Sequence, residues 1–386
     1  MTSSNLNSKS VLETFRKSMS IRPNTTDHLL VDVLVGLLEK YFNRVPDAAK
    51  IFQLIKSRGD TIFNDHIAFR AFELNSLLKV FLPYDYKVKF LDQEKKLPFN
   101  FESKKLTAVW LKHPNPDMPR IFISSCRLEE FPELASTVGP YLEQKKDFID
   151  QVDFNDTKAV IDYLHTPLWP TPTYKDYQIL SASSEYLGWV FFNKYYLNHF
   201  TLSIHKLKTF DYQKVVNIIL NSYKTCKDTS KLNSELRAGY KQIMISFNQF
   251  LKDNGLLMNS PKGKELNISP DQLLLQSSTK AQLIEGEFSD GINIVPGSYV
   301  EFAYRGLLDN VANDIVNSTD SINNFTDADF KEGFEVSNAD KIFESTYLRD
   351  VDESAVSNKS SFEKSKESLL SFLDRYQHDH PELQIF

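Results

Sequence analysis

The sequence has almost no cysteine, with only Cys126 and Cys226 among its 386 residues. Two cysteines exclude a disulfide-stapled scaffold and a cysteine-based zinc site, and they suit a reducing compartment. No apolar run approaches the length of a membrane-spanning helix, so no membrane association is expected. Basic residues are also short in number, 45 against 51 acidic residues, which leaves a net charge of −6. Since the chain has no basic stripe, nucleic acid is not an expected partner.

Local metal-binding motifs are missing as well. The eight histidines form no HExxH and no close His-x-His pair inside an expected helix or strand, so no local zinc motif exists. Any metal ligands must therefore come from separate segments that the fold brings together. What the chain does have is apolar material: 41% of its residues are hydrophobic and 29 are Phe. That amount can fill the core of one large domain or two ordinary ones.

Hydrophobic periodicity predicts a mixed chain of helices and strands. Helices are expected at residues 27–41, 47–57, 76–81, 132–152, 156–164, 183–193, 212–223, 234–252 and 361–376. Strands are expected at 64–72, 86–91, 106–112, 120–124, 197–205, 256–259, 273–277 and 299–304. The proline-rich stretch 166–172 is expected to be a rigid connector, and the polar stretch 310–329 a solvated loop.

The strand at 64–72 carries two side chains that are costly to bury. His66 and Arg70 are four residues apart, so they point to the same strand face, about 13 Å apart along the backbone. Buried there, both need a partner. A metal ion under the imidazole and a carboxylate under the guanidinium would supply the two partners. The alternative is a histidine bonded to neighbouring backbone and an arginine that reaches water.

A second stretch echoes the first. Residues 198–202 line up with residues 65–69: a small polar residue, then His, then alternating apolar and small residues. The repeat suggests that His66 and His199 occupy equivalent strands of duplicated modules. His205 lies on the same strand face as His199 but roughly 20 Å away, so a regular strand cannot bring both to one ion. The repeat favours His199 and leaves His205 at the strand end.

Glu301 is the carboxylate candidate. It lies among apolar and aromatic residues in the strand 299–304, where a buried carboxylate needs a cation or a proton. An ion pair with Arg305, four residues later on the same face, is the alternative. Two histidines and one carboxylate form the facial triad of non-haem Fe(II) sites, which leaves three coordination positions open.

With these residues the sequence resembles the 2-oxoadipate dioxygenase/decarboxylase (hydroxyglutarate synthase) family, in its eukaryotic branch of plants and fungi. The resemblance runs from about residue 30 to residue 347. It rests on matches in order at residues 65–72, 119–124, 169–180, 197–199, 274–279, 290–292, 298–303 and 333–345. The sequence departs from the family by extra residues near 209–233 and by a variable acidic segment after Gly306. Neither departure touches a candidate metal ligand.

The resemblance implies an α+β fold with a vicinal-oxygen-chelate-like core. Paired βαβββ modules, at about 60–125 and 197–305, would form a metal-holding β-sheet with added helices. The implied metal is Fe(II), and its implied ligands are His66, His199 and Glu301. Arg70 falls on the family's substrate-binding arginine, and Val336 on a backbone contact to substrate. Further candidate substrate contacts are Ser337 and Gln276.

The implied reaction converts 2-oxoadipate and O₂ to D-2-hydroxyglutarate and CO₂, a late step of lysine breakdown. Arg70 suits the distal carboxylate of the diacid because a guanidinium binds carboxylates in a bidentate manner. Two other readings stay open. One is another metal-dependent enzyme of this fold, such as an isomerase or a ring-cleaving dioxygenase, that acts on a different substrate. The other is a non-catalytic binding protein.

Three parts of the chain are expected. Residues 1–26 are rich in Ser, Thr and Asn and are expected to be a disordered N-terminus, although an excess of basic residues also permits an organellar leader. Residues 27–348 would form a single catalytic domain. Residues 349–386 would form a polar tail with a surface helix. The expected compartment is the cytoplasm, with the mitochondrion as the alternative.

Overall fold

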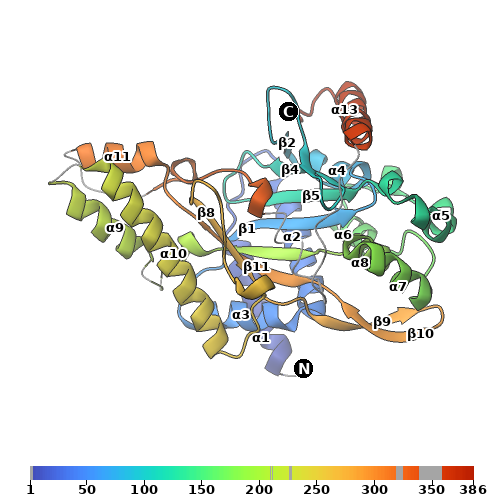
Figure 1. Cartoon of the computed structure of the whole chain (residues 1–386), viewed down its shortest axis with the longest axis horizontal. Coiled ribbons are helices and arrows are strands. Elements are labelled where there is room, and N and C mark those ends of the chain that lie inside the picture. Colours follow the sequence, from blue (N-terminus) through green and yellow to red (C-terminus); the bar gives the residue numbers. More distant parts are fainter. Residues whose placement is uncertain (1–2, 209, 211, 226–227, 319–324, 339–358) are drawn as a thin grey trace.

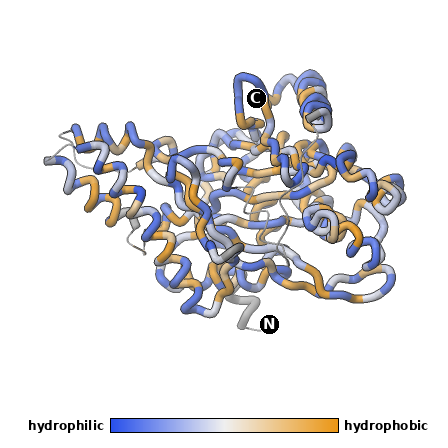
Figure 2. Tube along the Cα trace, in the orientation of Figure 1, coloured by the Kyte–Doolittle hydropathy of each residue, from blue (hydrophilic) through white to orange (hydrophobic). Residues whose placement is uncertain are grey.

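The computed structural model describes residues 3–208, 210, 212–225, 228–318, 325–338 and 359–386. A mixed β-sheet crosses the middle of the molecule, and helices surround it (Figure 1). Figure 2 shows hydrophobic residues gathered along the central strands, while the outer helices alternate between hydrophobic and hydrophilic residues. The alternation is typical of helices that bury one face and expose the other.

The central sheet is built from two halves. Its strand order is β2 (Lys87–Lys89), β4 (Leu106–Lys112), β5 (Arg120–Cys126), β1 (Asn64–Ala71), β6 (His199–Ser203), β11 (Tyr299–Arg305), β8 (Leu274–Ser278) and β7 (Asn267–Ile268), with β3 (Phe99–Phe101) beside β4. β1 and β6 meet antiparallel in the centre. β1 runs parallel to β5, and β6 runs parallel to β11. Counted outward from the centre, one half runs β1, β5, β4, β2 and the other runs β6, β11, β8, β7. In each half the first strand of the module thus lies beside the last one, in agreement with the predicted paired βαβββ modules.

Three N-terminal helices cover one face of this sheet. They are α1 (Ser3–Lys17), α2 (Asp27–Arg44) and α3 (Pro46–Ser57). Their aromatic side chains Phe15, Tyr41 and Phe52 surround Phe200 of β6, with ring centroids 5.2 to 6.5 Å apart. Because side chains alternate along a strand, the neighbours of Phe200 point to the opposite face. That face carries His199 and Thr201.

The remaining elements lie around the sheet. At one end of the sheet are three helices: α9 (Tyr212–Tyr223), α10 (Thr229–Asp253) and α11 (Asp309–Asn317). At the other end are the helices α5 (Ala135–Glu143), α6 (Thr157–His165), α7 (Tyr174–Ser183) and α8 (Glu185–Asn193). The hairpin of β9 (Leu283–Phe288) and β10 (Gly291–Pro296) lies at this second end too. α4 (Asn75–Phe81) follows β1, and α13 (Lys359–Asp379) is near the C-terminus. Short 3-10 helices are η1 (Leu82–Tyr84), η2 (Leu128–Glu130), η3 (Pro132–Leu134), η4 (Ile149–Gln151), η5 (Ile204–Lys206), η6 (Pro261–Gly263) and η7 (Asp327–Asp329). No helix in the described ranges is both long and apolar enough to cross a bilayer.

The N-terminus differs from its prediction. Residues 1–26 are expected to be disordered, yet α1 forms there, and Val11, Phe15 and Met19 are buried. Farther on, the Arg22 guanidinium donates two hydrogen bonds to the carboxylate of Asp27, 3.0 and 2.7 Å long. A few widely spaced apolar residues within a polar segment gave too weak a periodicity to reveal this helix.

Other differences concern polar segments. The expected loop at 310–329 begins as helix α11, in which Ala312 and Val316 are buried four residues apart; residues 319–324 lie outside the described part. The long helix expected at 132–152 is only α5 with short 3-10 turns around it, and α7, β3 and the β9–β10 hairpin were not predicted. At 256–259 the structure has an isolated bridge from Met258 to Thr279 in place of a strand. The expected boundary at 348/349 lies outside the described residues, while the tail helix is present as α13.

Candidate metal centre

The sheet register brings the three predicted metal ligands together. His66 in β1 pairs with Thr201 in β6, and Thr201 pairs with Glu301 in β11. His199 precedes Thr201 by two residues and so points to the same face. The ligand atoms of His66, His199 and Glu301 lie within 4.8 Å of one another, and all three side chains are buried. His199 and Glu301, which are 133 and 235 positions away from His66 in the chain, thus become its neighbours through strand pairing.

Each imidazole is held by the polar residue that precedes it. Asp65 Oδ1 is 2.8 Å from His66 Nδ1, and Asn198 Oδ1 is 2.9 Å from His199 Nδ1. An oxygen acceptor at Nδ1 keeps the ring proton there, so the lone pair of Nε2 faces the centre. Burial lowers the pKa of both histidines and favours their neutral form. Both rings are therefore in the state that a metal ion requires.

Glu301 faces these two nitrogen atoms. Its Oε2 is 3.2 Å from His199 Nε2, and its Oε1 is 3.7 Å from His66 Nε2. Gln276 Nε2 donates a 2.6 Å hydrogen bond to Oε1, whereas no described residue donates one to Oε2. Burial raises the pKa of Glu301 to about 8. Lone pairs that face each other this closely need a cation or a proton between them, so the donor set fits a metal ion.

Arg305 does not form the alternative ion pair with Glu301. Its Nε and Nη2 donate to the carboxylate of Asp65 at 2.6 and 2.9 Å. Its Nη1 donates to the carbonyl oxygens of Lys331 and Gly333, both at 2.9 Å. Burial alone would raise the pKa of Asp65, but Arg305 together with the His66 hydrogen bond holds it well below its usual range. Arg305 thus fixes the carboxylate that orients His66.

A cavity opens above these ligands, and Arg70 lies on its wall. The lining includes His66, His199, Glu301 and Arg70, as expected for residues on one face, and also Ala68, Phe69, Phe122, Ser124, Asn198, Gln276 and Phe334. The Arg70 guanidinium lies 5.2 and 5.3 Å from the ring centroids of Tyr186 and Trp189 in α8. Phe334 closes the other side, with its ring centroid 4.8 Å from that of His66. An apolar cavity with one cation and one metal-binding set suits a small anionic ligand.

Of the remaining candidate residues, Gln276 lines the cavity, whereas Val336, Ser337 and His205 do not. Gln276 touches Glu301 and accepts a 3.0 Å hydrogen bond from Asn338 Nδ2. Val336 is half-buried and Ser337 is exposed, and neither is among the described residues that line the cavity. His205 lies in η5, where its Nδ1 accepts a hydrogen bond from the Arg305 backbone at 3.4 Å. His205 is therefore not part of the metal centre.

Sequence reasoning missed several residues of the site. Asp65 and Asn198 did appear in the repeat, as the small polar residue before each histidine, but the repeat alone did not reveal that they orient the imidazole rings. Phe334, Tyr186 and Trp189 carried no signal, because an aromatic residue on a helix or loop is usually core. Only the folded chain shows that they pack against His66 and Arg70.

Comparisons with known proteins find similar sequences and structures. A family model described as 2-oxoadipate dioxygenase/decarboxylase matches residues 33–323. The chain is 33% identical over 345 residues to the 2-oxoadipate dioxygenase/decarboxylase, chloroplastic/amyloplastic, of Oryza sativa subsp. japonica, covering 84% of this chain and 80% of that one. A crystal structure of hydroxyglutarate synthase from Oryza sativa in complex with 2-oxoadipate superposes with a TM-score of 0.67 at 32% identity, covering 85% and 95% of the two chains. A putative glyoxalase superfamily protein from Ralstonia eutropha shares the fold, with a TM-score of 0.53 at 14% identity over 78% and 95% of the chains.

Proposed function

The chain belongs to the 2-oxoadipate dioxygenase/decarboxylase family, and we propose that it converts 2-oxoadipate and O₂ to D-2-hydroxyglutarate and CO₂ in an Fe(II)-dependent reaction. One observation carries the proposal: a single cavity contains both the two-histidine, one-carboxylate set and Arg70. The reaction would be a late step of lysine breakdown.

His66, His199 and Glu301 would hold the metal. Two imidazoles and one carboxylate suit Fe(II), which when bound supplies open positions for a chelating 2-oxo acid and for O₂. The chain contributes the fixed orientation of these ligands. Asp65 and Asn198 keep the Nδ1 protons in place, and Gln276 holds the Glu301 carboxylate. Such outer partners set ligand orientation and basicity.

Arg70 would bind the distal carboxylate of the substrate. It follows His66 by four residues on the same strand, about 13 Å along the backbone. The reach of both side chains shortens that gap to the length of one short diacid. Tyr186 and Trp189 lie beside the guanidinium and limit its orientation. A diacid that binds both ends of the cavity is thus placed with its 2-oxo acid end at the metal ligands.

Apolar side chains would exclude water from the reacting end. Phe122 and Phe334 line the cavity, and their ring centroids are 5.0 Å apart. Water exclusion strengthens the electrostatic contacts inside a site and prevents side reactions. We propose Gln276, which lies beside Glu301, as a polar contact to the substrate, while Val336 and Ser337, which do not line the cavity, remain predicted substrate contacts of the segment that follows Phe334.

Reconstitution tests the proposal. Metal-free protein is loaded anaerobically with Fe(II), Mn(II) or Zn(II), and O₂ uptake, CO₂ release and 2-hydroxyglutarate are measured with 2-oxo diacids of different chain length. We expect one O₂ consumed and one CO₂ released per 2-oxoadipate, with Fe(II) only. Turnover that is independent of O₂, or equal with Zn(II), would point to a different enzyme of this fold. Iron binding without turnover of any diacid would point to a binding protein.

For the compartment, we propose the cytoplasm, with the mitochondrion as the alternative. The low cysteine content suits a reducing compartment. The relative from Oryza sativa is chloroplastic/amyloplastic by name. A C-terminal fluorescent fusion of the full chain would separate these locations.

A further inference from the structure

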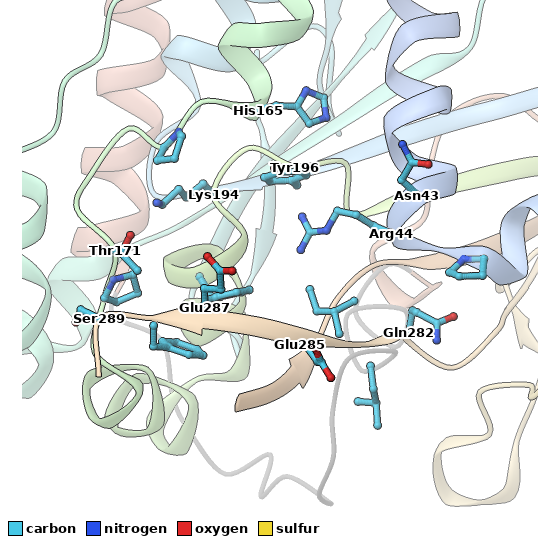
Figure 3. Close-up of a pocket in the computed structure, with 17 residues that line it drawn as sticks. Asn43, Arg44, His165, Thr171, Lys194, Tyr196, Gln282, Glu285, Glu287 and Ser289 are labelled. Carbon is cyan, nitrogen blue, oxygen red and sulfur yellow. The ribbon is translucent and has the colours of Figure 1, made fainter. Parts of the chain in front are cut away.

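A second, larger cavity lies apart from the metal centre (Figure 3). It has a volume of about 980 Å³ and lies between the end of α2, the proline-rich connector, the turn after α8 and the strand β9. None of its lining residues lines the metal-centre cavity. Ligand cavities in proteins commonly reach this size. We call it the Arg44 cavity, after the guanidinium that reaches into it.

Arg44 has only part of its bonding capacity filled. Its Nη2 donates a 2.6 Å hydrogen bond to Asn193 Oδ1, and its guanidinium stacks 4.0 Å from the Tyr196 ring centroid. Its Nη1 is shielded from water, and no described residue accepts a hydrogen bond from it. Burial lowers the pKa of Arg44 to about 10. A shielded cation with no acidic partner among the described residues is costly unless an anion joins it.

Lys194 adds a second cation to the same cavity. It is only 8% exposed, and its Nζ donates a 3.1 Å hydrogen bond to the Trp169 carbonyl oxygen. Burial lowers the pKa of Lys194 to about 8, and no described carboxylate offsets that effect. Its backbone has φ 57° and ψ −131°, a strained conformation for a residue other than glycine. Such strain persists where the surroundings over-determine a position, often at ligand sites.

The wall of the cavity formed by β9 and Phe192 carries acidic and apolar side chains. Glu285 and Glu287 lie on β9 and are exposed, and Figure 3 shows the Glu287 carboxylate and the Arg44 guanidinium directed into the same space. Phe192 and Phe288 add apolar surface, with ring centroids 4.8 Å apart. A ligand that fits this layout has one negative end for the cations, an apolar body and no second negative charge near the glutamates.

We propose that the Arg44 cavity binds a small organic acid with a single carboxylate and an apolar body. The carboxylate accepts hydrogen bonds from Arg44, in the field of Lys194, and the body packs against Phe192 and Phe288. The site is distinct from the proposed 2-oxoadipate site, and its test does not depend on turnover.

Benzoate is the probe, and isothermal titration of the full-length, metal-loaded protein is the measurement. We expect one benzoate per chain, and an affinity about tenfold or more lower in Arg44→Gln, since a charge-assisted hydrogen bond is lost. Benzamide, which has the same shape without the charge, is expected to bind at least tenfold more weakly than benzoate. Isophthalate, with a second carboxylate, is expected to bind more weakly than benzoate because of Glu285 and Glu287.

Controls separate this site from others. Arg58 also lies over aromatic rings, 4.7 and 4.3 Å from the centroids of Phe210 and Phe250, but outside the cavity. Arg58→Gln should leave benzoate affinity unchanged, and Arg70→Gln should do so too, because Arg70 lies in the other cavity. If Arg44→Gln does not fold, Glu287→Gln on the exposed wall should bind benzoate more tightly than the wild type. Absence of benzoate binding, equal binding of benzamide, or loss of affinity in Arg70→Gln would overturn the proposal.

Discussion

The substitution Asp65→Asn is expected to damage both stability and metal binding, for separable reasons. Asp65 is fully buried and accepts two hydrogen bonds from Arg305 and one from His66 Nδ1. Asparagine has nearly the same size but carries no charge. Arg305, itself only 2% exposed, would then keep a buried charge with no carboxylate among its described hydrogen-bond partners.

The two effects have different magnitudes. Removing one partner of a buried ion pair costs about 3–5 kcal/mol of folding stability. An asparagine amide can also donate to His66 Nδ1, which would move the ring proton to Nε2 and remove the lone pair that a metal needs. Loss of an outer partner of a metal ligand typically weakens metal affinity about 10- to 100-fold. Tautomer reversal places the expected loss at the upper end of that range.

Asp27→Asn is the matched control. Asp27 is also fully buried and also holds an arginine, Arg22, through two side-chain hydrogen bonds, but it belongs to a separate group with Asp85 and His113 and is not among the residues that line the metal-centre cavity. Urea unfolding and metal titration of the two variants give the comparison. Both should lose stability, and only Asp65→Asn should lose affinity for the Fe(II) that supports O₂ uptake with 2-oxoadipate. Equal metal affinity of Asp65→Asn and wild type, or an equal loss in Asp27→Asn, would refute the reasoning.

Three further predictions test other parts of the site. His199→Ala should lose bound metal and activity, whereas His205→Ala, which removes a half-buried ring outside the metal centre, should keep its metal. Equal metal content of the two purified variants would contradict the ligand assignment. Arg70→Lys should raise KM for 2-oxoadipate about tenfold or more with normal metal content, because lysine cannot bind a carboxylate in a bidentate manner. The KM for the mono-acid 2-oxohexanoate should change far less, and an equal change for both acids would show that Arg70 does not bind the distal carboxylate. In metal-free folded protein the pKa of Glu301 is about 8, above its ordinary value of 4.5. Between these pH values the folded chain holds one more proton than the unfolded chain, so its stability should fall as the pH rises from about 4.5 to 8. Glu301→Gln should remove this pH dependence in urea unfolding, and an unchanged pH dependence would rule out Glu301 as its source.

Part of the metal-centre prediction came from period-two alternation, which fixes which side chains share a strand face. The echo of residues 65–69 in residues 198–202 suggested that His66 and His199 are equivalent, and the apolar surroundings of Glu301 suggested a carboxylate that needs a cation or a proton. The family resemblance then joined the three residues into one ligand set. The sheet register then brings these ligands within 4.8 Å. Arg305 shows the limit of the same reasoning. Its spacing from Glu301 suggested a pair along one strand, but its guanidinium reaches across the sheet to Asp65.

The helices that were not predicted from the sequence share a physical cause. α1 and α11 are polar, and the residues of these helices whose burial is described include only a few buried ones, such as Phe15 and Val316. Their helical state depends on packing against distant segments more than on local periodicity. The Arg44 cavity was not predictable for a related reason, since it joins residues of α2, β9 and the turn after α8 that lie far apart in the chain.

Labelling with ¹⁸O₂ tests the central claim most directly. Iron-loaded protein is given 2-oxoadipate under ¹⁸O₂ without any added 2-oxoglutarate, and the product is analysed by mass spectrometry. If 2-oxoadipate is the molecule that is both decarboxylated and hydroxylated, label should enter 2-hydroxyglutarate twice, in the new carboxylate and in the hydroxyl group. Release of CO₂ at full rate without O₂, or a labelled hydroxyl group only on an added second substrate, would contradict the account.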